Sequence, residues 1–220
     1  MPCGKRRSDR IFKPCRQYIY RALFKAPDGT LLSDSRVWLM ATGRAWPAQP
    51  EVQDEVAQQF EVRDEELVEL RKHFVNRKLA ALDVITTQET TGVIENSEEV
   101  WMHPFRSNQF DFTEVAGFPE VQLPLEIGKT WTSYIHPGKG WGDWENTTVT
   151  SVYRVKKQEK LKTAFREFEN CWKIACVSTA PFGDSKHDFW FDAHYGFVRM
   201  EYTNYQGQTL TFDLEEVIEK

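Results

Sequence analysis

The sequence predicts a mainly β fold (β-rich α+β), in which antiparallel strands form a barrel or a sandwich. Short runs of β-branched and aromatic residues recur along the chain, separated by turn residues. Aromatic residues make up 14% of the sequence and include eight Trp, and such residues favour strands with large buried surfaces. Only one segment has a clear helical pattern, so we expect no more than one or two short helices.

The clearest strands lie between Phe189 and Glu216. Apolar residues alternate with polar ones on both arms of this segment: Val198, Met200 and Tyr202 on the first, and Leu210, Phe212 and Leu214 on the second. Residues 204–207 form the turn between them. Strict alternation means that one face is wet and the other buried. We therefore expect an antiparallel hairpin that forms one wall of the core.

The other strands are expected at shorter runs of the same character: residues 18–24, 31–41, 79–91, 99–104, 147–155 and 171–178. Residues 156–162 are expected to form a charged hairpin end. The Pro-containing segment 118–131 predicts a sheet edge that leads into the strand of Trp131, because Pro cannot donate to a strand ladder.

One helix is expected, over residues 64–75. Asp64 is its predicted N-cap, and Glu65 and Glu66 lie in the first turn, where the helix dipole favours negative charge. The apolar residues that follow have helical spacing but form only a narrow stripe: Leu67, Leu70 and Phe74. The helix should therefore lie on the surface of a sheet.

Charge divides the chain into a basic start and an acidic remainder. Residues 1–30 have a net charge of +6, whereas the whole protein has −5. We interpret residues 1–16 as a flexible basic arm and residues 17–220 as a single β-rich domain. The acidic domain predicts no nucleic-acid partner, although a basic arm can meet phosphates or anionic headgroups. The apolar runs are too short for a transmembrane helix.

Motifs for metal, nucleotide and nucleophilic chemistry are missing from the sequence. The five His and four Cys lack zinc-ligand spacing, so we predict no metal and no cofactor. We interpret the cysteines as structural or free thiols, with geometry allowing a Cys3–Cys15 bridge. No GxSxG elbow is present, and Gly138-Lys139-Gly140 is followed by aromatic residues rather than by a phosphate-binding helix.

Several strings resemble a pattern found in uncharacterised bacterial cell-envelope proteins that look like lipoproteins. They lie at residues 101–106, 118–131, 170–174 and 189–202, and include Trp101-Met102-His103-Pro104 and His194-Tyr195-Gly196-Phe197. The resemblance implies a curved antiparallel sheet or a lipocalin-like barrel, and a location in the cell envelope or periplasm. The first residues contain no apolar signal-peptide region, so the chain as written predicts a cytoplasmic protein if it is complete.

The Trp residues suggest where a ligand could bind. Trp141 and Trp144 lie in a glycine-rich loop, where they could form flat platforms for a ligand or pack across a barrel end. We expect Trp141, Trp144, Trp101, His103 and Arg106 to line such a site. The leading hypothesis is a non-enzymatic binding module for an apolar or amphipathic ligand, such as a lipid or a glycan, held in the barrel mouth or the sheet concavity.

Two alternatives stay open. A hydrolase or isomerase acting on sugar or lipid would use a carboxylate with an imidazole, Asp192 with His194, or a pair of carboxylates, Asp143 with Glu145. Each pair could equally close a turn or face solvent. The other alternative is a structural protein that docks onto an envelope partner through the sheet edge at residues 118–125.

Overall fold

The structure, a computed structural model, describes residues 10–80 and 85–219. In these residues twelve strands form one antiparallel sheet, whose order is β6-β5-β4-β3-β2-β1-β12-β11-β10-β9-β8-β7. The strands are β1 (Arg16–Lys25), β2 (Leu31–Ala45), β3 (Asp54–Phe60), β4 (Gln88–Glu95), β5 (Glu99–Met102), β6 (Glu120–Gln122), β7 (Thr130–Ile135), β8 (Val149–Lys162), β9 (Glu167–Ala180), β10 (Gly183–Asp192), β11 (Gly196–Thr203) and β12 (Thr209–Glu219).

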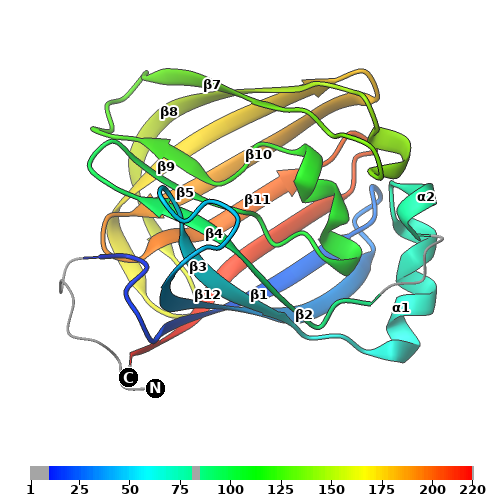
Figure 1. Cartoon of the computed structure of the whole chain (residues 1–220), viewed down its shortest axis with the longest axis horizontal. Helices are drawn as coiled ribbons and strands as arrows, with labels where there is room; N and C mark the ends of the chain where they lie inside the picture. Colours follow the sequence, from blue (N-terminus) through cyan, green and yellow to red (C-terminus); the bar gives the residue numbers. More distant parts are fainter. Residues whose placement is uncertain (1–9, 81–84, 220) are drawn as a thin grey trace.

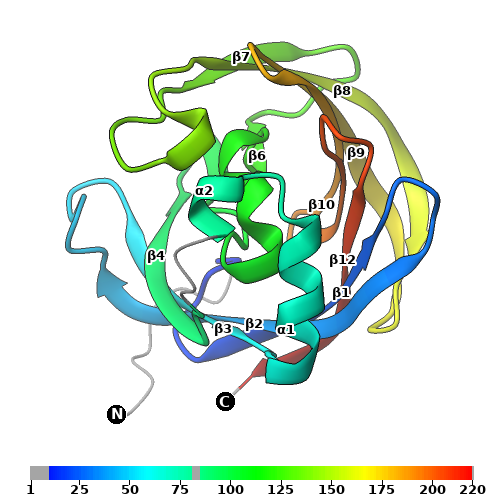
Figure 2. The same cartoon turned by 90° about the vertical axis from the view of Figure 1, so that its right-hand side faces the viewer.

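The sheet curls into a nearly closed barrel (Figures 1 and 2). Sequential strands are neighbours except for β6 and β7, and the two ends of the chain join where β1 pairs with β12, with Tyr18 opposite Val217 and Phe24 opposite Leu210. Strands β6 and β7 are the two edges of the sheet. The predicted mainly β, barrel-like fold is confirmed.

The closing hairpin has the expected inner and outer faces. Met200 of β11 lies opposite Phe212 of β12, and both side chains are fully buried. Arg199 pairs with Asp213 at 2.7 Å, Nε to Oδ1, and both of these side chains are partly exposed. Period-two alternation therefore indicated the buried face correctly, because an antiparallel barrel wall has solvent on one side only.

A helical segment inside the barrel fills much of its interior. The 3₁₀-helix η2 (Asn108–Val115) lies within the ring of strands, where Figure 2 shows it as a green coil. Phe110 contacts Phe60 of β3 and Phe212 of β12, with ring centroids 6.3 and 5.1 Å apart. Phe112 contacts Phe24 of β1. We call η2 the plug helix, because it lies inside the ring of strands and its aromatic side chains pack against strands between β3 and β11.

Short helices lie at one end of the barrel (Figure 1): α1 (Asp64–Leu70), η1 (Arg71–His73) and α2 (Arg77–Ala80). The expected helix over residues 64–75 is present but shorter, and its N-cap is Arg63 rather than Asp64. Backbone at Phe74 is already extended. Leu67 and Leu70 are buried, which agrees with a helix lying on the barrel through a narrow apolar stripe.

The expected strand over residues 79–91 is wrong at its start. Residues Arg77–Ala80 are helical, residues 81–84 lie outside the described part, and β4 begins at Gln88. The Asp143 carboxylate accepts hydrogen bonds from the N–H groups of Arg77, at 2.9 Å, and Lys78, at 3.4 Å. This contact stabilises the first turn of α2, and it comes from a loop far along the chain that local propensity does not include.

One strand was not expected from the sequence. The acidic and amide residues of β3 obscure the helical or strand pattern of its apolar positions, Val56 and Phe60. Pairing with both β2 and β4 stabilises this strand.

The expected charged hairpin end at residues 156–162 is present. These residues form the last part of β8, which pairs with β9 in an antiparallel hairpin as far as Lys162 opposite Glu167.

The described part of the predicted N-terminal arm lies against the barrel. Ile11 and Phe12 are buried, and their N–H groups donate to the Glu95 carboxylate at 2.7 and 3.0 Å. Cys15 is disulfide-bonded, while Cys171 and Cys176 are buried free thiols. Cys3 and the rest of residues 1–9 lie outside the described residues. Among the helices described, none has the length and apolar character needed to cross a bilayer.

Candidate functional site

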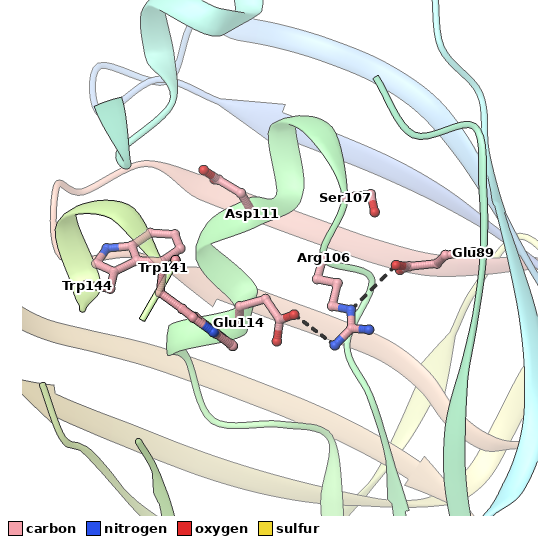
Figure 3. Close-up of a pocket in the computed structure, with 8 residues that line it drawn as sticks. Glu89, Arg106, Ser107, Asp111, Glu114, Trp141 and Trp144 are labelled. Carbon is pink, nitrogen blue, oxygen red and sulfur yellow. Dashed lines mark ion pairs between the residues drawn. The ribbon is translucent and has the colours of Figure 1, made fainter. Parts of the chain in front are cut away.

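A polar cavity of about 350 Å³ lies between the plug helix, β4 and the loop that carries Trp141 and Trp144. Eight residues line it: Glu89, Arg106, Ser107, Asp111, Glu114, Gly140, Trp141 and Trp144. Three of them, Arg106, Trp141 and Trp144, are among the five residues that sequence analysis nominated for a ligand site. The structure therefore brings together two separate candidate segments at one cavity (Figure 3).

Arg106 lies at the centre of the charged side of the cavity. Its Nη1 is 2.8 Å from Glu114 Oε1 of the plug helix, and its Nε is 3.6 Å from Glu89 Oε2 of β4. Figure 3 marks both ion pairs. Arg106 directly precedes the plug helix, so one guanidinium links the plug to the barrel wall. Forked guanidinium donors suit two carboxylates at once, which a lysine could not match geometrically.

Burial shapes the protonation of the cavity carboxylates. It raises the pKa of Glu114 to about 7, against the opposing effect of Arg106. Burial also raises the pKa of Glu89, again opposed by Arg106. Asp111, one helical turn before Glu114, has its pKa raised to about 7 by burial, and a backbone hydrogen bond from Phe112 only partly offsets the shift. The cavity therefore changes its charge close to neutral pH.

The two tryptophans play different parts. Trp144 is buried, and its Nε1–H donates to the Tyr205 hydroxyl at 3.0 Å. Trp141 is only half-buried, and in Figure 3 its ring lies next to Glu114. Trp144 thus forms a fixed back wall, whereas Trp141 offers an open aromatic face. Of the two roles left open by the sequence, Trp144 has the packing role, and a ligand contact of Trp141 stays a prediction.

The Trp loop is held in place by Asn76. Its Nδ2 donates to the Trp141 carbonyl at 2.9 Å, and its Oδ1 accepts from the Asp143 N–H at 3.2 Å. Gly142 between them has φ +60°, and a Cβ there would lie 2.4 Å from Asn76 Oδ1. Glycine is therefore required both for backbone conformation and for space. The short helix η3 (Gly142–Trp144) follows from this turn.

Trp101 and His103 lie in a separate aromatic cluster. The His103 ring is 4.7 Å from that of Trp101, 5.7 Å from Trp46 and 5.4 Å from Phe118, between centroids. Burial and the nearby Arg106 lower the pKa of His103 to about 3, so the ring is neutral. Its Nδ1 lies 3.2 Å from Arg106 Nη1. Neither residue lines the cavity described above, to which the contact between His103 and Arg106 connects the cluster.

The proposed catalytic pairs have structural contacts in the described residues. Asp192 Oδ1 accepts from the N–H groups of His194 and Tyr195, at 2.9 and 3.0 Å, while the His194 ring contacts Arg16 at 3.1 Å. Asp143 binds the start of α2, as described, and Glu145 Oε1 accepts from the Gly140 N–H at 2.5 Å. The structure does not bring the members of either pair together as an acid and a base.

Sequence analysis missed Glu89, Asp111 and Glu114. The two acids of the plug helix have helical spacing in a segment rich in Phe, and that segment connects β5 to β6 without a strand pattern. A long connection of this kind is uncommon in compact domains unless it has a function. The length of the connection was therefore the feature of the sequence that could have indicated these site residues. Among the described residues, no group of three or more His, Cys, Asp or Glu side chains could hold a metal ion.

Comparison with known proteins supports the fold and no more. No protein-family model matches the chain, and no curated protein matches it. A crystal structure of a protein from Bacteroides fragilis, predicted to be exported and with a YmcC-like fold, is similar with a TM-score of 0.50 and 11% identity over 94% of this chain and 97% of that one. A predicted lipoprotein from Parabacteroides distasonis has a TM-score of 0.49 and 11% identity, over 94% and 96%.

Proposed function

We propose that this protein is a non-enzymatic binding module that holds a small amphipathic molecule in the cavity beside the plug helix. The observation that carries the proposal is that the half-buried ring of Trp141 lines the same cavity as two partly buried charged groups, Arg106 and Glu114. Ligand pockets typically combine apolar walls with a few well-placed polar groups in a volume of roughly 300–1,000 Å³.

This cavity favours an amphipathic ligand over a purely apolar one. Arg106, Glu89, Asp111 and Glu114 would lose hydration without compensation if an alkyl chain alone filled the space. A glycan or a lipid headgroup offers hydroxyl or charged groups to these side chains and a hydrocarbon face to Trp141. Side chains of the plug helix occupy the centre of the barrel. The ligand would therefore bind at the barrel mouth and not along the barrel axis.

We also propose a location in the cell envelope. The similar B. fragilis protein is described as exported, and the sequence itself resembles envelope proteins. Ligand binding at a barrel mouth suits a protein that meets lipids or glycans outside the cytoplasm. The similarity to that protein is one of fold, and the proposed location is an inference from this fold and from the sequence resemblance.

Tryptophan NMR signals test the binding proposal. The probe is 2-phenylethanol, a small neutral amphipathic molecule, titrated into ¹⁵N-labelled protein. The indole signals of Trp141 and Trp144 should shift in a saturable way, while that of Trp172 on β9 should not. Trp141→Ala should abolish saturation, and Trp172→Ala should preserve it. Equal shifts at Trp172, or saturable binding that survives Trp141→Ala, would contradict the cavity as the site.

A second candidate, docking of a protein partner, is favoured by one observation. Strand β6 (Glu120–Gln122) lies at an edge of the sheet, within the segment proposed for docking. An edge strand can accept an added strand from another chain. Gln122 is opposite Glu99 of β5 at a position where the strand pair has no ladder hydrogen bond, so its N–H faces the outer edge. Gln122→Pro would remove this donor, and loss of a co-purifying partner in this variant but not in Trp141→Ala would support docking.

A further inference from the structure

The charges lining the cavity are unequal. Three carboxylates, Glu89, Asp111 and Glu114, share it with a single guanidinium, that of Arg106. Arg106 already contacts both glutamates, at 2.8 and 3.6 Å. Its positive charge is therefore balanced inside the protein, and little of it remains to attract an anionic ligand. Among the described residues Asp111 is the one of these three carboxylates that has no ion pair with Arg106.

Asp111 is the carboxylate without a counter-charge. Its Oδ2 is buried and has no hydrogen-bond partner among the residues that the structure describes. In Figure 3 its side chain projects from the plug helix on the side of Trp144, away from Arg106. An ionised carboxylate left alone in such a place costs free energy, since it has given up hydration without a replacement. A cation bound beside Asp111 would remove that cost.

The aromatic walls suit the same kind of ligand. Trp141 and Trp144 both line the cavity that contains Asp111. Trp is the best aromatic partner for a cation, because the face of its ring carries negative potential. Tyr205, whose hydroxyl accepts from Trp144, is also close enough to Asp111 for the carboxylate to help raise its pKa, after the larger effect of burial. The Asp111 carboxylate and the faces of the tryptophan rings would therefore both attract a cation.

We propose that the ligand carries an ammonium group, which binds between Asp111 and the Trp141–Trp144 wall. This inference rests on the proposed function and names the headgroup of the same ligand. Asp111 acts as the anchor for the cation, Trp141 contacts its apolar part, and the Arg106–Glu114 pair closes the other side of the cavity. Proteins recognise organic ammonium groups through this combination of a carboxylate and aromatic rings.

Three probes with a common phenyl part separate the headgroup from the rest of the ligand: phenethylamine, 2-phenylethanol and 3-phenylpropanoate. Affinities are measured by calorimetry at pH 8 on the intact chain. Phenethylamine should bind about tenfold tighter than 2-phenylethanol, as expected for one charge-assisted hydrogen bond in a partly dry site. The anion 3-phenylpropanoate should bind more weakly than both.

Asp111→Asn keeps the shape of the side chain and removes its charge. In this variant the preference for the amine over the alcohol should fall to about one. Glu169→Gln removes an equal charge from an exposed position on β9 and should leave the preference intact. These variants distinguish the anchor from the general acidity of the protein.

Each outcome has one meaning. If the alcohol binds at Trp141 but the amine binds no tighter, the ammonium proposal is wrong and the proposed function survives. If the amine preference persists in Asp111→Asn, the anchor is wrong, because another group provides the charge. If none of the three probes binds, the proposed function itself fails. Circular dichroism and a thermal melt of each variant establish that it is folded.

Discussion

Arg106 Nη1 lies 2.8 Å from Glu114 Oε1, so the chain entering the plug helix is bound to the last turn of that helix. The same guanidinium reaches Glu89 on the barrel wall. Plug, wall and cavity are therefore connected through one side chain. This relationship makes the charged side of the cavity part of the structure that holds the plug in place.

Removing Arg106 should destabilise the protein strongly. Arg106→Met leaves Glu114 and Glu89 largely buried without a counter-charge, and we expect a loss of about 2–3 kcal/mol in the free energy of unfolding. Urea denaturation measures it. The control is Arg21→Met, which breaks an exposed pair with Asp34 and should cost less than about 1 kcal/mol. Equal losses in the two variants would mean that the cavity ion pairs have no special role.

Asp111→Asn should stabilise the free protein at alkaline pH. The pKa of Asp111 is raised by burial to about 7 in the folded protein, above its ordinary value of 3.8. The folded state therefore holds a proton that the unfolded state has lost, and stability falls as pH rises from about 4 to 7. Above pH 7 the variant should be more stable by on the order of 1–3 kcal/mol, and the difference should shrink towards pH 5.

Asp34→Asn is a control in which the change in stability at alkaline pH should have the opposite sign to that of Asp111→Asn. Arg21 lowers the pKa of Asp34 in the folded protein, so its ionised form stabilises the fold above the unfolded pKa. Asp34→Asn should therefore lose stability at pH 8, where Asp111→Asn gains it. Urea denaturation of both variants at pH 5 and pH 8 makes the comparison. A loss at pH 8 in both would show that Asp111 has a favourable partner in the folded state.

Phe110→Ala should test the plug as part of the core. Phe110 is fully buried between Phe60 of β3 and Phe212 of β12 inside the barrel, so its truncation leaves a cavity in the core. We expect a loss of about 3–5 kcal/mol in the free energy of unfolding. Val68→Ala, at an exposed position of α1, should change it by less than about 0.5 kcal/mol. A small effect at Phe110 would indicate a plug that leaves the barrel without unfolding it.

His187 should make the protein sensitive to acid. Burial lowers its pKa to about 3 in the folded state, from 6.5, and its Nε2 lies 3.2 Å from the Ser178 hydroxyl. Because the unfolded chain takes up the proton first, this contribution is complete above pH 6.5 and is lost as pH falls towards 3. Relative to His187→Gln, the native protein should lose about 2 kcal/mol between pH 7 and pH 5. The exposed His136→Gln variant should show no such difference.

The sequence by itself determined the class of fold and much of its wall. Alternation at Met200 and Phe212 indicated the buried face of the closing hairpin, because side chains in a strand point alternately to the two faces of the sheet. Proline-rich residues 118–125 indicated an edge, and β6 is an edge strand. These features depend on a few neighbouring residues, so they can be recognised locally. The glycine-rich loop with its two tryptophans was recognisable for the same reason.

Only the tertiary structure decided what lies inside the barrel and which residues share a cavity. Asp111 and Glu114 meet Trp141 because the plug helix enters the ring of strands, and no local pattern reports on that position. The separation of Trp101 and His103 from the cavity, and the turn contacts of Asp192, likewise depend on long-range packing. Residue types and spacing predict on which face of a strand a side chain lies. The protonation of a buried carboxylate depends on its burial and on nearby charges, and both arise only when distant segments of the chain come together.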